Sequence, residues 1–251
     1  MGRFLGLVTF SDNMISLIRG YSLVKWTGHL WTISLEEQFY FILPFFLFSL
    51  LIKNWRNKKQ LFVYFISIEL ILIFTRLAIV TLLIDHPYIW TSPFRVDSVL
   101  FGVFLGLGMF DCLKINSLVS GFLGLLLLYS IAWIPGGVGS VGLNQVFIYS
   151  LVALGAMLMV YSCLEKNFIS RMLSFRPISY LGKISYGLYV FHILTIDITQ
   201  KYFENKSVDL LSIFAISLLL TIIVSALSYE LFEKYFLKIK KKFEIIKSRP
   251  A

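Results

Sequence analysis

Seven apolar runs, each close to the length needed to cross a lipid bilayer, constrain this chain more than any other feature. A membrane-spanning helix needs about 20 apolar residues, and irregular backbone cannot face lipid because its polar groups would lack partners. The chain is 58% hydrophobic and 15% charged, which is more apolar than a soluble domain of 251 residues could accommodate. We therefore predict an all-α, polytopic integral membrane bundle. Seven complete spans are expected near 34–52, 61–84, 94–110, 117–134, 143–163, 184–203 and 210–232, with a partial one near 4–18.

The basic residues predict an orientation in the membrane and give no indication of a nucleic-acid partner. The formal net charge is +9, but the lysines and arginines gather between the apolar runs, at 53–59 and 166–183, and in a C-terminal tail, 234–251. If the runs alternate, these three segments share one side, which the excess of positive charge marks as cytoplasmic. We expect a cytoplasmic tail that contacts anionic membrane lipid.

A polar cluster lies at the start of the first complete run, in the segment from His29 to Tyr40. It contains Trp31 and the adjacent carboxylates Glu36 and Glu37, followed directly by apolar residues. Charged groups inside a membrane are costly, so they normally face a protein interior or a watery cavity. The orientation above places this cluster near the non-cytoplasmic end of its span.

Further charges lie inside later runs, beginning with Glu69 and Arg76. These two residues are seven apart on one helix face, two turns from each other. We therefore expect each to meet another helix, most simply in a structural interhelical pair.

Arg95 and Asp97 open the next run. An arginine at a helix start, where the dipole is already positive, predicts an anionic partner. A carboxylate of Glu36 or Glu37 is one candidate partner and a ligand phosphate is another. Three glycines follow that would let a neighbouring backbone come close, and they are Gly102, Gly106 and Gly108.

A third polar segment contains Ser185, Tyr186, Tyr189 and His192. Ser185, Tyr189 and His192 recur at helical spacing, so a hydroxyl, a phenol and an imidazole share one face. Such neighbours often satisfy a buried histidine without any chemistry. A position inside a membrane helix also favours a functional role, and both interpretations stay open.

Together these segments resemble acyltransferase family 3, a family of membrane proteins that O-acylate carbohydrates. The chain is interpreted as one domain, residues 1–251, and the resemblance covers it from about Thr9 onward. The segment from Ser228 to Glu233 is similar to the family's closing span. The resemblance rests on three motifs, which are His29-x-Trp31-x-x-Ser34-x-Glu36-Glu37-Gln38-Phe39-Tyr40 with Pro44, Arg95-x-Asp97 with Gly102, and Ser185-Tyr186-Gly187-x-Tyr189-x-x-His192.

The resemblance implies transfer of an acyl group from acetyl-CoA, or another acyl-CoA, to a hydroxyl of a cell-envelope carbohydrate. It also implies a bacterial inner membrane, with acyl-CoA as a co-substrate and no permanently bound cofactor or metal. The implied catalytic residues are Glu36, Glu37, His29 and His192. The implied substrate-binding residues are Arg95, Asp97, Trp31, Ser185, Tyr186 and Tyr189.

The family pattern also includes a histidine base on a first membrane helix, which this sequence does not match. The sequence enters near what would be the third of about ten spans, so the resemblance implies an N-terminally truncated chain. We expect no independent acetyl transfer, and a separate N-terminal half as a partner. If the chain is active alone, His29 or His192 becomes the candidate base.

Two other classes of protein remain open. A transporter or flippase would also place Glu, Arg and His in its spans. A non-catalytic membrane partner is the other alternative. Saturable acetyl-CoA binding would favour the acyltransferase, whereas substrate uptake into vesicles without acetyl transfer would favour transport.

Overall fold

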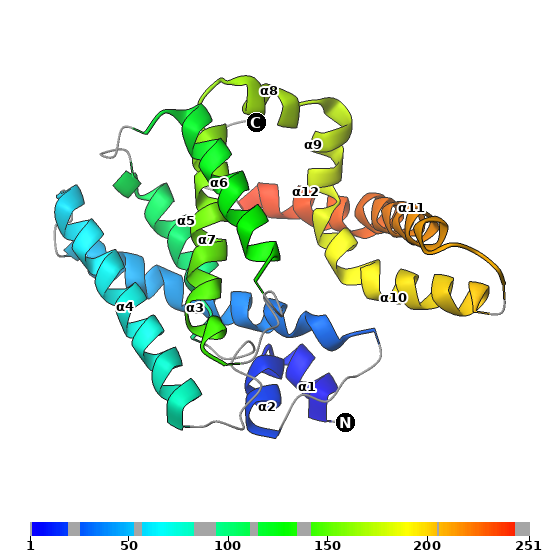
Figure 1. Cartoon of the computed structure of the whole chain (residues 1–251), viewed down its shortest axis with the longest axis horizontal. Coiled ribbons are helices and arrows are strands. Elements are labelled where there is room, and N and C mark those ends of the chain that lie inside the picture. Colours follow the sequence, from blue (N-terminus) through cyan, green and yellow to red (C-terminus); the bar gives the residue numbers. More distant parts are fainter. Residues whose placement is uncertain are drawn as a thin grey trace. The chain divides into compact units, whose positions relative to one another are not determined.

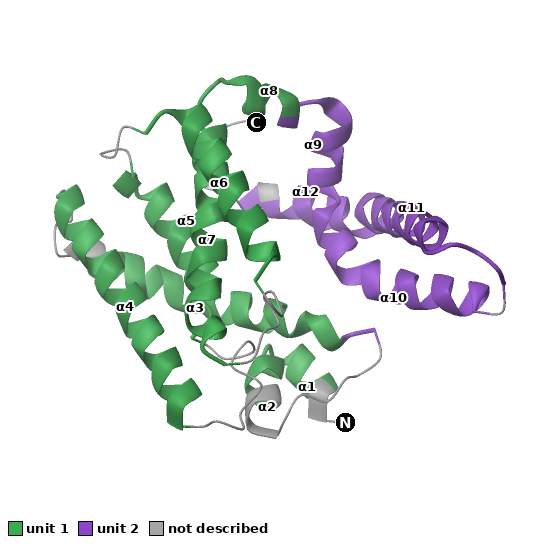
Figure 2. Cartoon of the chain, in the orientation of Figure 1, with its two compact units in different colours: residues 1–23, 28–172 green, residues 24–27, 173–251 purple. Residues whose placement is uncertain are grey.

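A computed structural model of the chain describes residues 2–19, 26–52, 57–82, 94–110, 115–134, 142–204 and 206–243. Within these ranges the regular structure is helical and contains no strand, as predicted. The chain forms two compact units (Figure 2). Unit 1 comprises residues 1–23 and 28–172, and unit 2 comprises residues 24–27 and 173–251. The last eight residues of the predicted basic tail lie outside the described residues.

Three helical stretches of the described residues are long and apolar enough to cross a membrane. They are α4 (Lys58–Leu82), α7 (Asn144–Cys163) and the continuous stretch Leu210–Lys240. Two shorter apolar helices are α5 (Asp97–Gly106) and α6 (Ser117–Ala132). The helical membrane architecture is thus supported, but seven complete spans are not confirmed. Within the run predicted at 94–110, the structure has a ten-residue helix, α5. Its length of about 15 Å is half the thickness of the hydrocarbon layer of a bilayer.

Unit 1 is built around an apolar core from three helices, to which α4 and α5 contribute phenylalanines. The ring of Phe65 on α4 packs edge-on against Phe101 and Phe104 of α5, with centroid separations of 4.7 and 5.1 Å. Phe104 is fully buried, and Met157 of α7 completes the cluster. Figure 1 follows the remaining helices of this unit, which are α1 (Gly2–Val8), α2 (Asp12–Arg19), the 3₁₀ helix η1 (Gly28–Leu30), α3 (Trp31–Ile52) and α8 (Phe168–Leu173).

The prediction of one partial span over residues 4–18 is wrong. The segment forms two short helices, α1 and α2, separated by a turn in which Phe10 has a positive φ of 51°. Gly6 allows the two helices to meet, since a Cβ there would lie 2.9 Å from the Ile15 side chain and 3.0 Å from the Asp12 Cα. The polar residues after Phe10 therefore end the first helix and begin a second.

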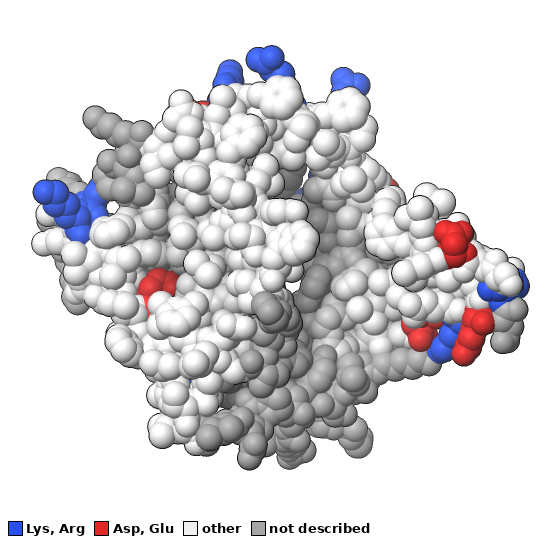
Figure 3. All heavy atoms as spheres, in the orientation of Figure 1, with Lys and Arg blue, Asp and Glu red and all other residues white. Residues whose placement is uncertain are grey.

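Close helix packing in unit 1 occurs where α6 meets α7. A Cβ on Gly124 would lie 2.7 Å from the carbonyl oxygen of Gly155, so this position has no room for a side chain, and a Cβ on Gly155 would lie 2.9 Å from the Leu128 side chain. The prediction for Gly102 and Gly106 is wrong, because no described atom lies within 4 Å of a Cβ at either position. On the face shown in Figure 3 the surface over α6 is uncharged, which suits a helix that faces lipid.

Unit 2 is centred on α10 (Ser185–Phe203) and α11 (Leu210–Ser228). Gly187 of α10 lies against Ser225 of α11, and the hydroxyls of Thr195 and Thr221 are 2.6 Å apart. Lipid provides no hydrophobic force between helices, so small residues and hydroxyl pairs join them. The other elements of this unit are α9 (Arg176–Lys183), the π-helical turn η5 (Tyr229–Glu233) and α12 (Lys234–Phe243).

Candidate functional site

The start of α3 separates its buried residues from its carboxylates. Trp31 and Ser34 are buried, as expected for residues three apart on one helical face, whereas Glu36 and Glu37 are exposed on another. His29, in the 3₁₀ turn before the helix, is half-buried. The first motif thus divides into a side that packs and a side that can meet a ligand.

Gln38 holds the N-terminal helices against α3. Its Nε2 donates to the Asn13 Oδ1 at 2.9 Å and to the Phe10 carbonyl at 2.7 Å. In return, the fully buried Asn13 donates from Nδ2 to the Gln38 Oε1 at 3.1 Å. Sequence reasoning missed Asn13. The only signal is the polar break Ser11-Asp12-Asn13 within an apolar run, and it does not identify a partner for Asn13.

A cavity of about 570 Å³ opens beside this contact. Its volume lies within the range of about 300–1,000 Å³ that is usual for small-molecule sites. Among the described residues that line it, Glu37 is the only carboxylate, so it is the acid of the first motif that faces a ligand-sized space. The lining residues are Thr9, Phe10, Glu37, Gln38, Tyr40, Phe41 and Ile42.

Arg95 lies between two aromatic rings. Its guanidinium carbon is 4.4 Å from the ring centre of Tyr149 and 5.4 Å from that of Trp31. A small cavity of about 50 Å³ is lined by Arg95, Asp97 and Tyr149, among others. Three predicted binding residues, Trp31, Arg95 and Asp97, are therefore brought together, with Tyr149 as a member that the sequence did not indicate. An anionic partner for Arg95 stays a prediction.

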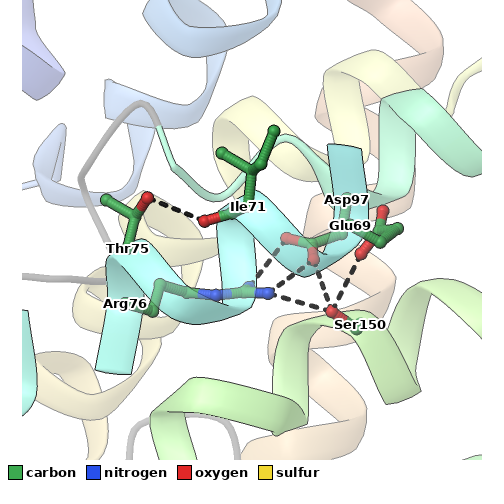
Figure 4. Close-up of polar contacts among 6 residues, drawn as sticks. All are labelled: Glu69, Ile71, Thr75, Arg76, Asp97 and Ser150. Carbon is green, nitrogen blue, oxygen red and sulfur yellow. Dashed lines mark hydrogen bonds and ion pairs between the residues drawn. The ribbon is translucent and has the colours of Figure 1, made fainter. Parts of the chain in front are cut away.

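Asp97 forms a buried ion pair with Arg76 (Figure 4). The Arg76 Nη1 and Nη2 donate to the two carboxylate oxygens of Asp97 at 3.0 and 2.9 Å, and the two side chains are 0% and 1% exposed. Asp97 is the first residue of α5, where the helix dipole favours a negative charge. The expected interhelical pair of Arg76 is confirmed.

Ser150 of α7 links this ion pair to Glu69. The Arg76 Nη2 donates to the Ser150 hydroxyl at 2.9 Å. That hydroxyl lies 2.6 Å from an Asp97 oxygen and 3.2 Å from the Glu69 Oε2. Helices α4, α5 and α7 therefore meet at one polar cluster, defined as Glu69, Arg76, Asp97 and Ser150, which holds Asp97 and hence the adjacent Arg95 in place. A binding role for Asp97 itself stays a prediction.

The third motif lies on α10, in unit 2. The His192 Nδ1 is 2.6 Å from the Tyr189 carbonyl oxygen, and the two rings are 5.8 Å apart. Because a carbonyl oxygen can only accept a hydrogen bond, Nδ1 is the donor in this contact. Tyr189 and His192 share a half-buried face, whereas Ser185 and Tyr186 are exposed. Because these residues and those of α3 belong to different units, one joint site stays a prediction.

No group of three or more His, Cys, Asp or Glu side chains suited to a metal ion occurs in the part of the chain that the structure describes. The candidate side chains described above are carboxylates, cations and aromatic rings on apolar helices. This combination is typical of a helical membrane protein.

Comparison with known families identifies the class. Residues 4–230 match the acyltransferase domain, and the chain belongs to this family, acyltransferase family 3. The match spans both units, so it includes all three motifs.

Individual relatives agree with this assignment. The chain is 27% identical over 229 residues to proteins of Staphylococcus aureus strains COL and MSSA476 that are named as candidate O-acetyltransferases. These alignments cover 84% of this chain and 36% of each relative, so the chain spans about a third of their length. No solved structure matches the chain.

Proposed function

We propose that this protein takes part in transfer of an acyl group, in the first instance acetyl, from acyl-CoA to a hydroxyl of a cell-envelope carbohydrate. The observation that carries the proposal is the position of Glu37. This carboxylate belongs to the most specific family motif and lines a cavity large enough for a small ligand. The names of the relatives support acetyl as the transferred group.

Acyl transfer to a hydroxyl needs a base for the hydroxyl proton and donors for the thioester oxygen as it becomes anionic. In our proposal Glu37 accepts a hydrogen bond from the acceptor hydroxyl, and Glu36 adds negative charge beside it. His29, just before α3, and His192, on α10, are the candidate bases.

The proposed contact for the CoA phosphates is Arg95. Its guanidinium is held by Trp31 and Tyr149 and lies beside the small cavity that Asp97 also lines. A planar guanidinium is suited to bidentate phosphate binding. On α10, Ser185, Tyr186 and Tyr189 are the proposed contacts of the acceptor sugar, because they combine hydroxyls with aromatic surface.

The proposed location is the bacterial inner membrane, with the C-terminus in the cytoplasm. The three apolar helical stretches support a membrane location, and the basic residues of α12 support the orientation. Acyl-CoA is made in the cytoplasm, so the donor would have to reach the site across or within the bilayer.

Two measurements test the proposal. The purified chain in micelles should bind acetyl-CoA saturably, and Arg95→Gln should weaken this binding while Arg171→Gln, on an exposed arginine of α8, should not. Membranes that hold the chain together with the N-terminal half expected as its partner should then transfer labelled acetyl groups to envelope glycans. Glu37→Gln should lower kcat/KM by about 10²- to 10⁴-fold, with exposed Glu165→Gln as the matched control.

Two results would contradict the proposal. One is acetyl-CoA binding that does not saturate. The other is substrate uptake into vesicles with no acetyl transfer, which would favour a transporter.

A further inference from the structure

Unit 2 contains a groove of about 520 Å³ at the junction of three elements. The start of α10 forms one wall, and η5 with α12 forms the other. The lining residues are Tyr186, Phe232, Glu233, Phe236, Leu237 and Lys240.

The groove changes from apolar to cationic along its length. Phe232, Phe236 and Lys240 are four residues apart, so they follow one another along one helical face. Both phenylalanines are 64% exposed, which leaves their rings available to a ligand. A ligand that matches this wall is an amphiphile, with an apolar body and an anionic end.

The length of α11 gives the groove an expected depth in the membrane. The helix has 19 residues, most of them apolar, which span about 28 Å, close to the roughly 30 Å of hydrocarbon in a bilayer. The next residues, Tyr229–Glu233, form the π-helical turn, and α12 follows. With α11 across the bilayer, Phe232 lies at the edge of the hydrocarbon and Lys240 two turns further out, at the depth of the lipid headgroups.

The charge of α12 selects an anionic ligand. The helix carries five lysines and no acidic residue. The neighbouring Glu230 is paired with Lys234, whose Nζ is 2.6 Å from its carboxylate. Lys240 therefore faces the groove in a region of net positive charge, although Glu233 also lines it. A zwitterionic headgroup would gain less from this surface than an anionic one.

We propose that this groove binds an anionic phospholipid, with its phosphate at Lys240 and an acyl chain along Phe236 and Phe232. The lipid contacts proposed here, Lys240, Phe236 and Phe232, are not among the residues proposed for acyl transfer, although Tyr186, which also lines the groove, is a proposed acceptor contact. The bound lipid would fix α12 at the membrane surface and link it to Tyr186 at the start of α10.

The test uses the full chain in detergent micelles, titrated with phosphatidylglycerol or with phosphatidylcholine, with retained lipid counted by native mass spectrometry. We expect phosphatidylglycerol to be retained in preference. Lys240→Gln should lower its affinity about fivefold, whereas Lys240→Arg should keep it. Lys238→Gln is the matched control, because this lysine is on the same helix but does not line the groove.

The apolar wall has its own control pair. Phe236→Ala should reduce phosphatidylglycerol retention, while Phe214→Ala, which removes an equally exposed ring on α11 outside the groove, should not. The proposal is overturned if both lipids are retained equally, or if Lys238→Gln and Lys240→Gln act alike. Displacement of the lipid by soluble CoA would also overturn it, since the groove would then take a water-soluble phosphate ligand.

Discussion

Two ion pairs of the same length, one in each unit, show what burial changes. Arg76 and Asp97 of unit 1 approach to 2.9 Å with side chains 0% and 1% exposed. Lys201 and Asp197 of unit 2 also approach to 2.9 Å, but their side chains are 52% and 28% exposed. The first pair joins two helices, and the second lies within one. The distance between the charged atoms does not tell which pair contributes more to stability. Only the buried pair leaves a charge without solvent when one partner is removed.

Removing the cation of each pair is the most direct test of this comparison. Arg76→Gln leaves the Asp97 carboxylate buried beside Ser150 and Glu69, and we expect it to lower the free energy of unfolding by about 3–5 kcal/mol. Lys201→Gln, at the exposed pair, should cost about 0.2–1 kcal/mol at most. Denaturant titration in micelles measures both.

Salt separates the two pairs further. At about 1 M salt the screening length falls to about 3 Å, which weakens the exposed pair and leaves the buried one nearly unchanged. Equal costs for the two variants, or equal salt dependence, would break the comparison.

The substitution Ser150→Ala tests whether the Ser150 hydroxyl, which links Glu69 to the ion pair, contributes to stability. The substitution removes a hydroxyl that contacts three charged or acidic side chains, and hydrogen bonds to charged groups contribute about 1.5–3 kcal/mol. We expect a loss of unfolding free energy in that range. Ser130→Ala is the control, because this exposed serine bonds only to the Leu127 carbonyl of its own helix among the described contacts. If Ser150→Ala left the free energy of unfolding unchanged, the hydroxyl of Ser150 would not be needed to stabilise the ion pair.

The glycines of unit 1 sharpen the comparison for packing. Gly124→Ala places a Cβ 2.7 Å from the Gly155 carbonyl oxygen, so α6 and α7 must separate at a cost of about 1–3 kcal/mol. Gly102→Ala meets no described atom within 4 Å and should stabilise α5 by about 0.5–1 kcal/mol. Thermal unfolding in micelles should therefore shift in opposite directions. Shifts of the same sign would contradict the packing of α6 on α7.

The smallest expected effect concerns Asp209, outside the membrane at the start of α11. Its carboxylate accepts hydrogen bonds from the Ser212 hydroxyl and backbone N–H at 2.7 and 2.9 Å, which lower its pKa below the ordinary value of 3.8. Because its pKa is lower in the folded state, the ionised Asp209 carboxylate stabilises the folded protein at any pH above the ordinary pKa. This stabilisation is lost as the pH falls through the pKa of the folded state.

Asp209→Asn removes the titrating group and keeps an acceptor for the helix start. The protection of the Ser212 amide against hydrogen exchange, relative to its intrinsic exchange rate at the same pH, should thus fall in acid for the wild type and change less for Asp209→Asn. An identical pH dependence for the two would show that another group controls this helix end.

Much of the fold could be predicted because hydropathy reports helix length directly. The helices α4, α7 and α10 begin and end within three residues of the predicted runs. The failures fall where the chain must turn. Gly108, with φ of 70°, lies just beyond the end of α5, and Phe10 breaks the first helix. Hydropathy does not reveal either turn, since a turn can be as apolar as a helix.

The site was only partly predictable. Trp31, Arg95 and Asp97 were identified from their motifs and do come together, and Arg76 was expected to pair between helices. Tyr149 and Asn13 were not expected, because a tyrosine or an asparagine in a long chain gives no sign of which helix it will face.

The sequence by itself determined the class of this protein. Its apolar runs require membrane helices, and its motifs show the acyltransferase family over residues 4–230. Both are local properties of the chain. The tertiary structure decided which groups meet. It paired Arg76 with Asp97, stacked Arg95 on Tyr149 and placed Glu37 beside a cavity. Such choices depend on which helix faces are opposed in space, and helix pairing is set by close packing and by the cost of leaving a buried charge unpaired.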